Sequence, residues 1–95
     1  MTTVEQHDDF SLVTAAVNAG VPSRMAISLV AYITRGKPVG HFLTAILSND
    51  LVGACNRADD ENKHLIYNFV FFLFNYAPSD CWGSSDRVMK WRGLQ

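Results

Sequence analysis

Residues 59–78 read DDENKHLIYNFVFFLFNYAP, and this stretch decides what kind of fold the chain can adopt. Its middle, from Phe69 to Phe74, is aromatic and β-branched, a composition that also suits a buried strand. Three acids come first, however, and acids in a first turn are stabilised by the positive end of a helix dipole. The run from 60 to 75 is also longer than an ordinary strand. It therefore predicts a helix that is apolar nearly all round, either the central helix of the domain or half of an oligomer interface.

Upstream of this stretch, glycine and proline divide the chain into three further helical segments. Asn18-Ala19-Gly20 ends a first helix, in which apolar residues recur three and four apart from Phe10 onward. Residues 36–40, GKPVG, end a second helix that begins near Ser23, because proline between two glycines cannot continue a helix. A third helix is expected from 41 to 57, where an i, i+3, i+4 stripe of apolar residues recurs.

Downstream, residues 76–83 predict a loop that contains Pro78, and Ser84 or Ser85 can cap a last short helix. The first eight residues are polar and acidic and are expected to form a flexible tail. The sequence thus predicts an all-α fold over residues 1–95. This single domain would be a compact bundle of four to five short helices around the aromatic-rich fourth helix.

Bulk composition excludes several classes of protein. Ninety-five residues, 48% of them hydrophobic, suffice for one packed domain and not for two. A formal net charge of −1 argues against a nucleic-acid partner, which is normally met by a basic excess. No apolar run reaches the roughly 20 residues of a membrane span, and the first residues carry no signal peptide. Two cysteines make no disulfide framework, so we expect free thiols in a cytosolic protein.

The chain holds no complete catalytic motif, so we expect that it is not an enzyme and binds no cofactor. No histidine or cysteine pair has the spacing of a metal site, and we expect no metal; the isolated candidates are His7, His41, Cys55, His64 and Cys81. Gly83-Ser84-Ser85 lacks the strand–turn–helix elbow of a serine nucleophile and is better explained as a helix cap. The acids at 59–61 are likewise explained by capping rather than by acid–base chemistry.

Four polar side chains are harder to assign to structure alone. His41 follows the rigid break at 36–40, and Asn49 lies in the middle of the predicted third helix, where a short polar side chain costs helix stability. Arg57 and Asn62 flank the turn that follows. Either these groups form a buried polar network between helices, or they bind a ligand or partner. Only the second alternative leaves them reachable from solvent.

Aromatic residues near the C-terminal loop leave a similar choice. Trp82, Trp91 and Tyr76 could roof the small core, or they could anchor an interface, because Trp and Tyr dominate binding hot spots. Together with the polar group, the predicted binding residues are therefore His41, Asn49, Arg57, Asn62, Tyr76 and Trp82.

Four segments of the chain also carry a family resemblance. They read PVGHFLTAILSNDL at 38–51, RADDEN at 57–62, FLFNYAP at 72–78 and CWGS at 81–84, and Trp91 follows. In this combination the chain resembles a family of short proteins encoded by bacteriophages and prophages, over roughly residues 24 to 91. The family pattern often has Tyr where Phe74 stands, and Pro where Ser85 stands.

The resemblance implies a context rather than a reaction: a phage product that acts in the bacterial host cytoplasm. Small phage proteins without catalytic motifs commonly act by stoichiometric binding. The leading hypothesis is thus a non-enzymatic protein that inhibits a host factor, such as a defence system, by protein–protein contact. The alternative is a homo-oligomeric sponge that sequesters a small anionic signalling ligand such as a cyclic nucleotide. Its partners would be a host protein, or a second copy of itself with such a ligand.

Overall fold

All the regular structure in the described part of the chain is helical, which confirms the predicted all-α fold. A computed structural model describes residues 9–94, and the predicted tail at 1–8 lies outside them. The elements, in chain order, are α2 (Asp9–Asn18), α3 (Ser23–Arg35), α4 (His41–Leu47), α5 (Leu51–Arg57), the 3-10 turn η1 (Asn62–His64), α6 (Ile66–Tyr76), the 3-10 turn η2 (Ser79–Cys81) and α7 (Ser85–Lys90).

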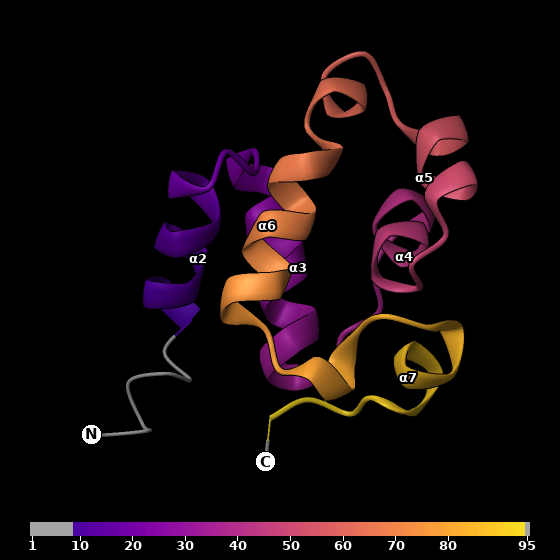
Figure 1. The fold of residues 1–95 in the computed structure, drawn as a ribbon. Helices are drawn as coiled ribbons and strands as arrows, with labels where there is room; N and C mark the ends of the chain where they lie inside the picture. Colours follow the sequence, from indigo (N-terminus) through magenta and orange to yellow (C-terminus); the bar gives the residue numbers. More distant parts are fainter. Residues whose placement is uncertain (1–8, 95) are drawn as a thin grey trace.

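The helices form two neighbouring groups that α6 joins (Figure 1). On one side α2 packs against both α3 and α6. On the other side α4 packs against α5, α6 and α7, and α7 closes the lower end of the molecule beside η2. The acidic stretch before α6 lies at the opposite end from α7.

The predicted third helix, 41–57, is wrong as one element, because it breaks into α4 and α5 at residues 48–50. Asn49 adopts a left-handed conformation with φ 63°, which interrupts a right-handed helix. Asp50 then caps α5: its Oδ1 accepts a hydrogen bond from the Gly53 backbone N–H at 2.9 Å. The short polar side chains at 49 and 50 therefore sit at a turn, where they are favourable, and not in the middle of a helix.

The predicted fourth helix also begins later than expected, at Ile66 rather than near residue 60. The acid at Asp59 serves η1 instead, where its Oδ1 accepts the Asn62 backbone N–H at 2.7 Å. Leu65, with φ −117° and ψ 8°, separates η1 from α6. The aromatic helix is thus the fifth α-helix of the described chain. Only its inner side is buried, so the expectation of a bundle arranged around it is not confirmed.

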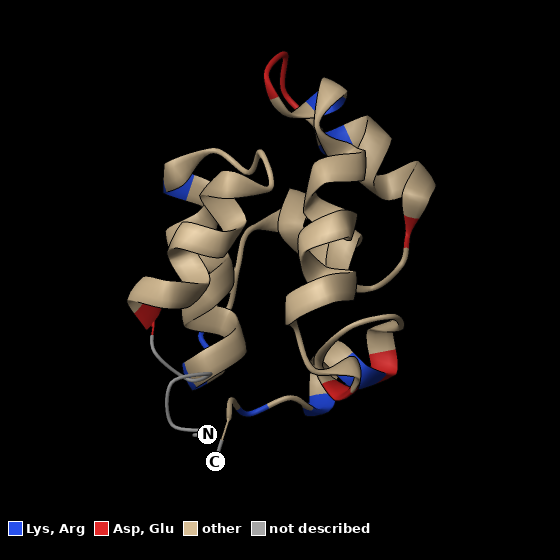
Figure 2. Cartoon of the chain, turned by 60° about the vertical axis from the view of Figure 1, so that its left-hand side comes forward, with Lys and Arg blue, Asp and Glu red and all other residues tan. Residues whose placement is uncertain are grey.

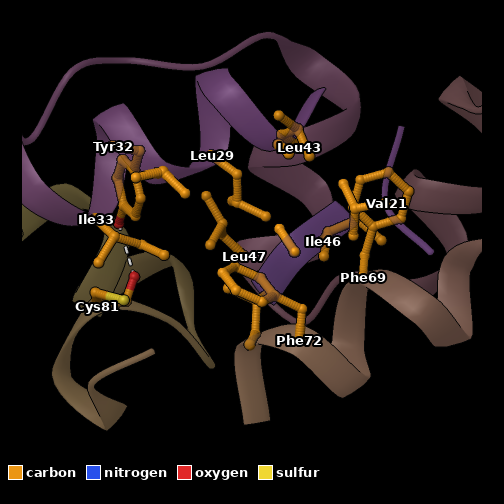
Figure 3. Close-up of a cluster of buried hydrophobic side chains, with 14 of the residues drawn as sticks. Val21, Leu29, Tyr32, Ile33, Leu43, Ile46, Leu47, Phe69, Phe72 and Cys81 are labelled. Atoms are coloured by element: carbon orange, nitrogen blue, oxygen red, sulfur yellow. Dashed lines mark hydrogen bonds between the residues drawn. The ribbon is translucent and has the colours of Figure 1, made fainter. Parts of the chain in front are cut away.

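The core lies between α2, α3, α4 and the inner side of α6, and Figure 3 shows part of it. Phe69 meets Phe42 of α4 edge to face, with ring centroids 5.3 Å apart. At the other end of the core the Tyr32 hydroxyl donates to the backbone carbonyl of Cys81 at 2.7 Å, which ties η2 to α3. Trp91 is half-buried, and its indole Nε1–H donates to the Tyr32 carbonyl at 3.0 Å. Trp91 therefore covers the core, which was one of the two predicted alternatives, the other being an interface anchor.

The segment after α7 runs back along the end of α3. The Leu94 backbone N–H donates to the Thr34 carbonyl at 3.0 Å. Gly36 makes this approach feasible: it has φ 72°, and a Cβ there would stand 2.6 Å from the backbone carbon of Arg92. The break at 36–40 therefore ends α3 and also makes room for the C-terminal segment.

Candidate functional site

The six predicted binding residues occupy different surroundings. His41, Asn49 and Arg57 are exposed, so they do not form the buried network that was one of two alternatives. Asn62 is buried, at 4% exposure, with no hydrogen-bond partner for its Oδ1 among the described residues. Asn62 is therefore out of reach of a surface ligand. Tyr76 is half-exposed and stacks on Phe72 at 5.7 Å between ring centroids, which places it over the end of the core.

Two of the predicted residues line one polar cavity of about 390 Å³. His41 comes from the start of α4 and Arg57 from the end of α5. The remaining lining is mostly hydroxyl and carboxylate: Thr44, Ala45, Ser48, Asp50 and Ser85. Arg57 forms no ion pair within residues 9–94. The cavity thus holds an unpaired guanidinium, but it also holds the Asp50 carboxylate, which opposes a strong preference for anions.

Two others, Asn49 and Trp82, meet in a larger and more apolar groove of about 450 Å³, here called the Trp82 groove. It lies between α6, the 48–50 turn and the η2–α7 loop. Its lining residues are Asn49, Val70, Phe74, Ala77, Ser79, Trp82, Gly83 and Arg87. The groove therefore combines aromatic and aliphatic surface with a single cation.

Local sequence holds the rim of the Trp82 groove in place. The Gly83 backbone N–H donates to the Leu47 carbonyl at 2.7 Å, which fastens the loop to the end of α4. Ser84 caps α7 by accepting the Arg87 N–H at 3.2 Å, as predicted from sequence. The Arg87 guanidinium donates to the carbonyls of Ser79 at 3.1 Å and Trp82 at 3.3 Å. These acceptors are neutral, and within residues 9–94 Arg87 has no carboxylate partner, so its charge is oriented but not neutralised.

Beside this groove, α6 turns an apolar face to solvent. We call Tyr67, Val70, Phe71 and Phe74 the outer stripe; they follow the i, i+3, i+4, i+7 spacing of one helical face. Their three aromatic members are 73%, 42% and 77% exposed, respectively. The helix from 66 to 76 contains no Lys, Arg, Asp or Glu. Figure 2 shows the acidic loop before α6 at one end of the molecule and a mixture of basic and acidic residues at the other.

The two cysteines differ in their surroundings. Cys55 is exposed on α5, whereas Cys81 is buried in η2. Burial raises the pKa of the Cys81 thiol to about 12, and the nearby Asp80 charge adds to this shift. Burial also raises the pKa of Tyr32 to about 12, with a further contribution from Cys81. A thiol held neutral in this way is a poor nucleophile.

The part of the chain from 9 to 94 contains no cluster of three or more His, Cys, Asp or Glu side chains able to hold a metal ion. None of the helices in that part has both the length and the apolar character needed to cross a bilayer. Comparisons with protein-family models, curated proteins and solved structures find no match for the chain. The site is therefore assigned from its own geometry, as an apolar groove on a small all-α domain.

Proposed function

We propose that this chain is a non-enzymatic binding protein that inhibits a bacterial host factor, such as a defence system, by protein–protein contact at the Trp82 groove. The observation that carries the proposal is the meeting of Trp82, Phe74 and Arg87 in one groove of about 450 Å³. Trp, aromatic and Arg side chains in a well-packed pocket are the residues that dominate binding energy at protein interfaces.

The geometry also favours a partner that brings apolar side chains and a carboxylate. Val70, Phe74 and Trp82 supply surface that gains from losing water. Arg87 is already oriented by two carbonyls, so a partner's carboxylate would meet a guanidinium with little rotamer freedom left to lose. The resemblance to phage-encoded proteins supplies the proposed setting, the cytoplasm of a bacterial host.

A genetic assay tests this proposal directly. The chain is expressed in bacterial strains that each carry one defence system, and the plating of a phage restricted by that system is measured. We expect the wild-type chain to restore plating in at least one strain. Ser79→Arg, which fills the groove from an exposed position, should abolish this effect. Ser28→Arg, at an exposed serine of α3 outside the groove, is the matched control and should retain it.

The proposal fails if no strain responds, or if Ser79→Arg is as active as the control. A responding strain also provides the purified target for a binding measurement. The complex should then form at one chain to one target site. Arg87→Glu should weaken it, chiefly by faster dissociation, because it places an acid where the partner's carboxylate binds.

The alternative, sequestration of a small anionic ligand, is favoured by one observation: the polar cavity that holds Arg57 and His41. Asn49, Tyr76 and Trp82, which are also among the predicted binding residues, do not line it. Under this alternative a panel of cyclic and linear nucleotides would raise the thermal midpoint of the chain, and Arg57→Ala would abolish the rise. Ser79→Arg, outside that cavity, would leave the rise intact.

A further inference from the structure

We infer that the outer stripe of α6 is the interface of a homodimer, in which α6 packs antiparallel against α6 of a second copy about a two-fold axis. This inference goes beyond the proposed function and does not depend on it. Trp82 and Arg87 lie outside the stripe, but Val70 and Phe74 belong to both surfaces, so a second copy and a host partner would compete for these two side chains.

The stripe is arranged as one side of a helix–helix contact. Phe69, Phe72 and Leu73 point into the core and are completely buried. At 100° per residue, Tyr67, Phe71 and Phe74 fall on the opposite side of the helix and within one narrow arc. The spacing of four and three residues is that of the ridges by which helices interlock. A helix with two apolar faces needs a second neighbour, and within residues 9–94 none covers this face.

The stripe supplies most of the area that a stable dimer requires. With about 200 Å² for each aromatic side chain, the exposed fractions of Tyr67, Phe71 and Phe74 leave about 400 Å² per chain. Two copies would then bury about 800 Å² of aromatic surface, against a lower limit of about 1,200 Å² in total for a standard interface. Val70 and Leu51, which are 37% and 65% exposed and share a neighbouring cleft, extend the patch towards that limit.

The absence of charge on α6 favours a second copy over other occupants. A two-fold interface brings a surface against itself, so any charge near the axis meets its like. The helix 66–76 carries none. A parallel pairing would bring the acidic loop 59–61 next to its own copy. An antiparallel pairing instead brings it towards the other end of the partner, which carries both basic and acidic residues (Figure 2), so the acidic loop does not meet its own copy. In sequence these are Arg87, Lys90 and Arg92 together with Asp80 and Asp86.

This arrangement fixes a specific register. With the axis between Val70 and Phe71, Tyr67 of one chain faces Phe74 of the partner subunit, and the reverse contact repeats across the axis. Charged residues can therefore be substituted at positions 67 and 74 in two combinations. Equal charges would repel across both contacts, whereas opposite charges would attract across both.

The first experiment is sedimentation velocity of the full chain over a concentration series. The wild type should be dimeric, and Tyr67→Glu with Phe74→Glu should raise the dimer dissociation constant by about 100-fold or more. Phe10→Glu is the matched control: Phe10 on α2 is 78% exposed and Phe74 is 77%, so the two are equally accessible. The control should remain dimeric. Helical circular dichroism shows whether each variant is folded.

The second experiment tests the register. Tyr67→Glu with Phe74→Lys places Glu opposite Lys twice in the antiparallel dimer, and it should dimerise at least about ten times more tightly than the double glutamate variant. Equal weakening in the two double variants would overturn the antiparallel register. A monomeric wild type at about 500 µM, in the weak-affinity range, would overturn the dimer. If the wild type is such a monomer, loss of host inhibition in Tyr67→Glu, which lies outside the Trp82 groove, would show that the stripe binds the host protein instead. Ser79→Arg should leave the dimer intact. A loss of dimerisation can therefore be distinguished from a loss of host binding at the Trp82 groove.

Discussion

The inner and outer faces of α6 carry the same kinds of side chain in opposite surroundings. Phe69 and Phe72 are fully buried, whereas Tyr67 and Phe74 lie largely in solvent. The two sets alternate within eleven residues and differ little in hydrophobicity. The difference comes from tertiary packing: α2, α3 and α4 cover the inner face, and no helix of the described chain covers the outer one.

This difference shows how little an apolar residue's type says about its role. A buried phenylalanine stabilises the monomer through packing and loss of water. An exposed one contributes to stability only when a second molecule covers it. The same helix can therefore support a fold with one face and an assembly with the other, and substitutions can measure the two contributions separately.

The largest expected effect comes from truncating one aromatic on each face. Phe72→Ala should reduce the free energy of unfolding by about 3–5 kcal/mol, because it leaves a cavity in the core. Phe74→Ala should change the stability of the monomer by no more than about 0.5 kcal/mol. Urea unfolding at two protein concentrations measures both. The loss in Phe72→Ala should be independent of concentration, and any loss in Phe74→Ala should grow with it. Similar, concentration-independent losses would contradict the distinction between the faces.

A smaller effect is expected from raising the pH. It tests how well water is excluded from the part of the core around Tyr32 and Cys81 (Figure 3). Both groups are acids whose pKa rises on folding, to about 12 from 10.0 for Tyr32 and from 9.0 for Cys81. Below about pH 8 both groups are almost fully neutral in either state, and neither changes the free energy of unfolding. Above it the unfolded chain loses these protons first, so stability should fall as pH rises towards about 12.

Cys81→Ala should flatten this alkaline loss, although it also costs some packing at neutral pH. A thiol reagent provides an independent check at constant pH. Cys55 is exposed and should react quickly, whereas Cys81 should react only as fast as the protein opens. Rapid reaction of both thiols in the folded protein would mean that the region around Tyr32 and Cys81 is accessible to solvent.

Much of the fold follows from local signals in the sequence. The stops at 18–20 and 36–40 and the Ser84 cap depend on glycine, proline and a side-chain oxygen, whose preferences act within a few residues. The split at 48–50 was missed because the apolar stripe continues through it. Asn49 and Asp50 were the local signal for a turn, and they could have been interpreted in that way. The late start of α6 was missed because Asp59 can cap a 3-10 turn as well as a helix.

The candidate site was less predictable because it depends on which surfaces meet. Sequence reasoning selected Trp82 and Asn49, but nothing local indicated that they face Val70 and Arg87 across one groove. The outer stripe could have been found from the i, i+3, i+4, i+7 spacing of α6. That spacing alone does not identify which of two apolar faces turns inward, since the choice depends on where α2, α3 and α4 pack.

The smallest effect is expected at the two asparagines of α6. One lies on the covered side of the helix and the other on its exposed side, so they allow the same comparison with polar side chains. The half-buried Asn68 donates its Nδ2–H to the Ala19 carbonyl at 2.9 Å, joining α6 to the α2–α3 turn. Asn68→Ala should cost about 1 kcal/mol, because the lost hydrogen bond outweighs the better helix propensity of alanine. The exposed Asn75 donates only to the Phe71 carbonyl one turn back, at 2.8 Å. Asn75→Ala should therefore be neutral or stabilise by up to about 0.5 kcal/mol. Thermal unfolding of the two variants side by side measures the difference, and equal midpoints would show that the α2–α3 turn gains nothing from its bond to α6.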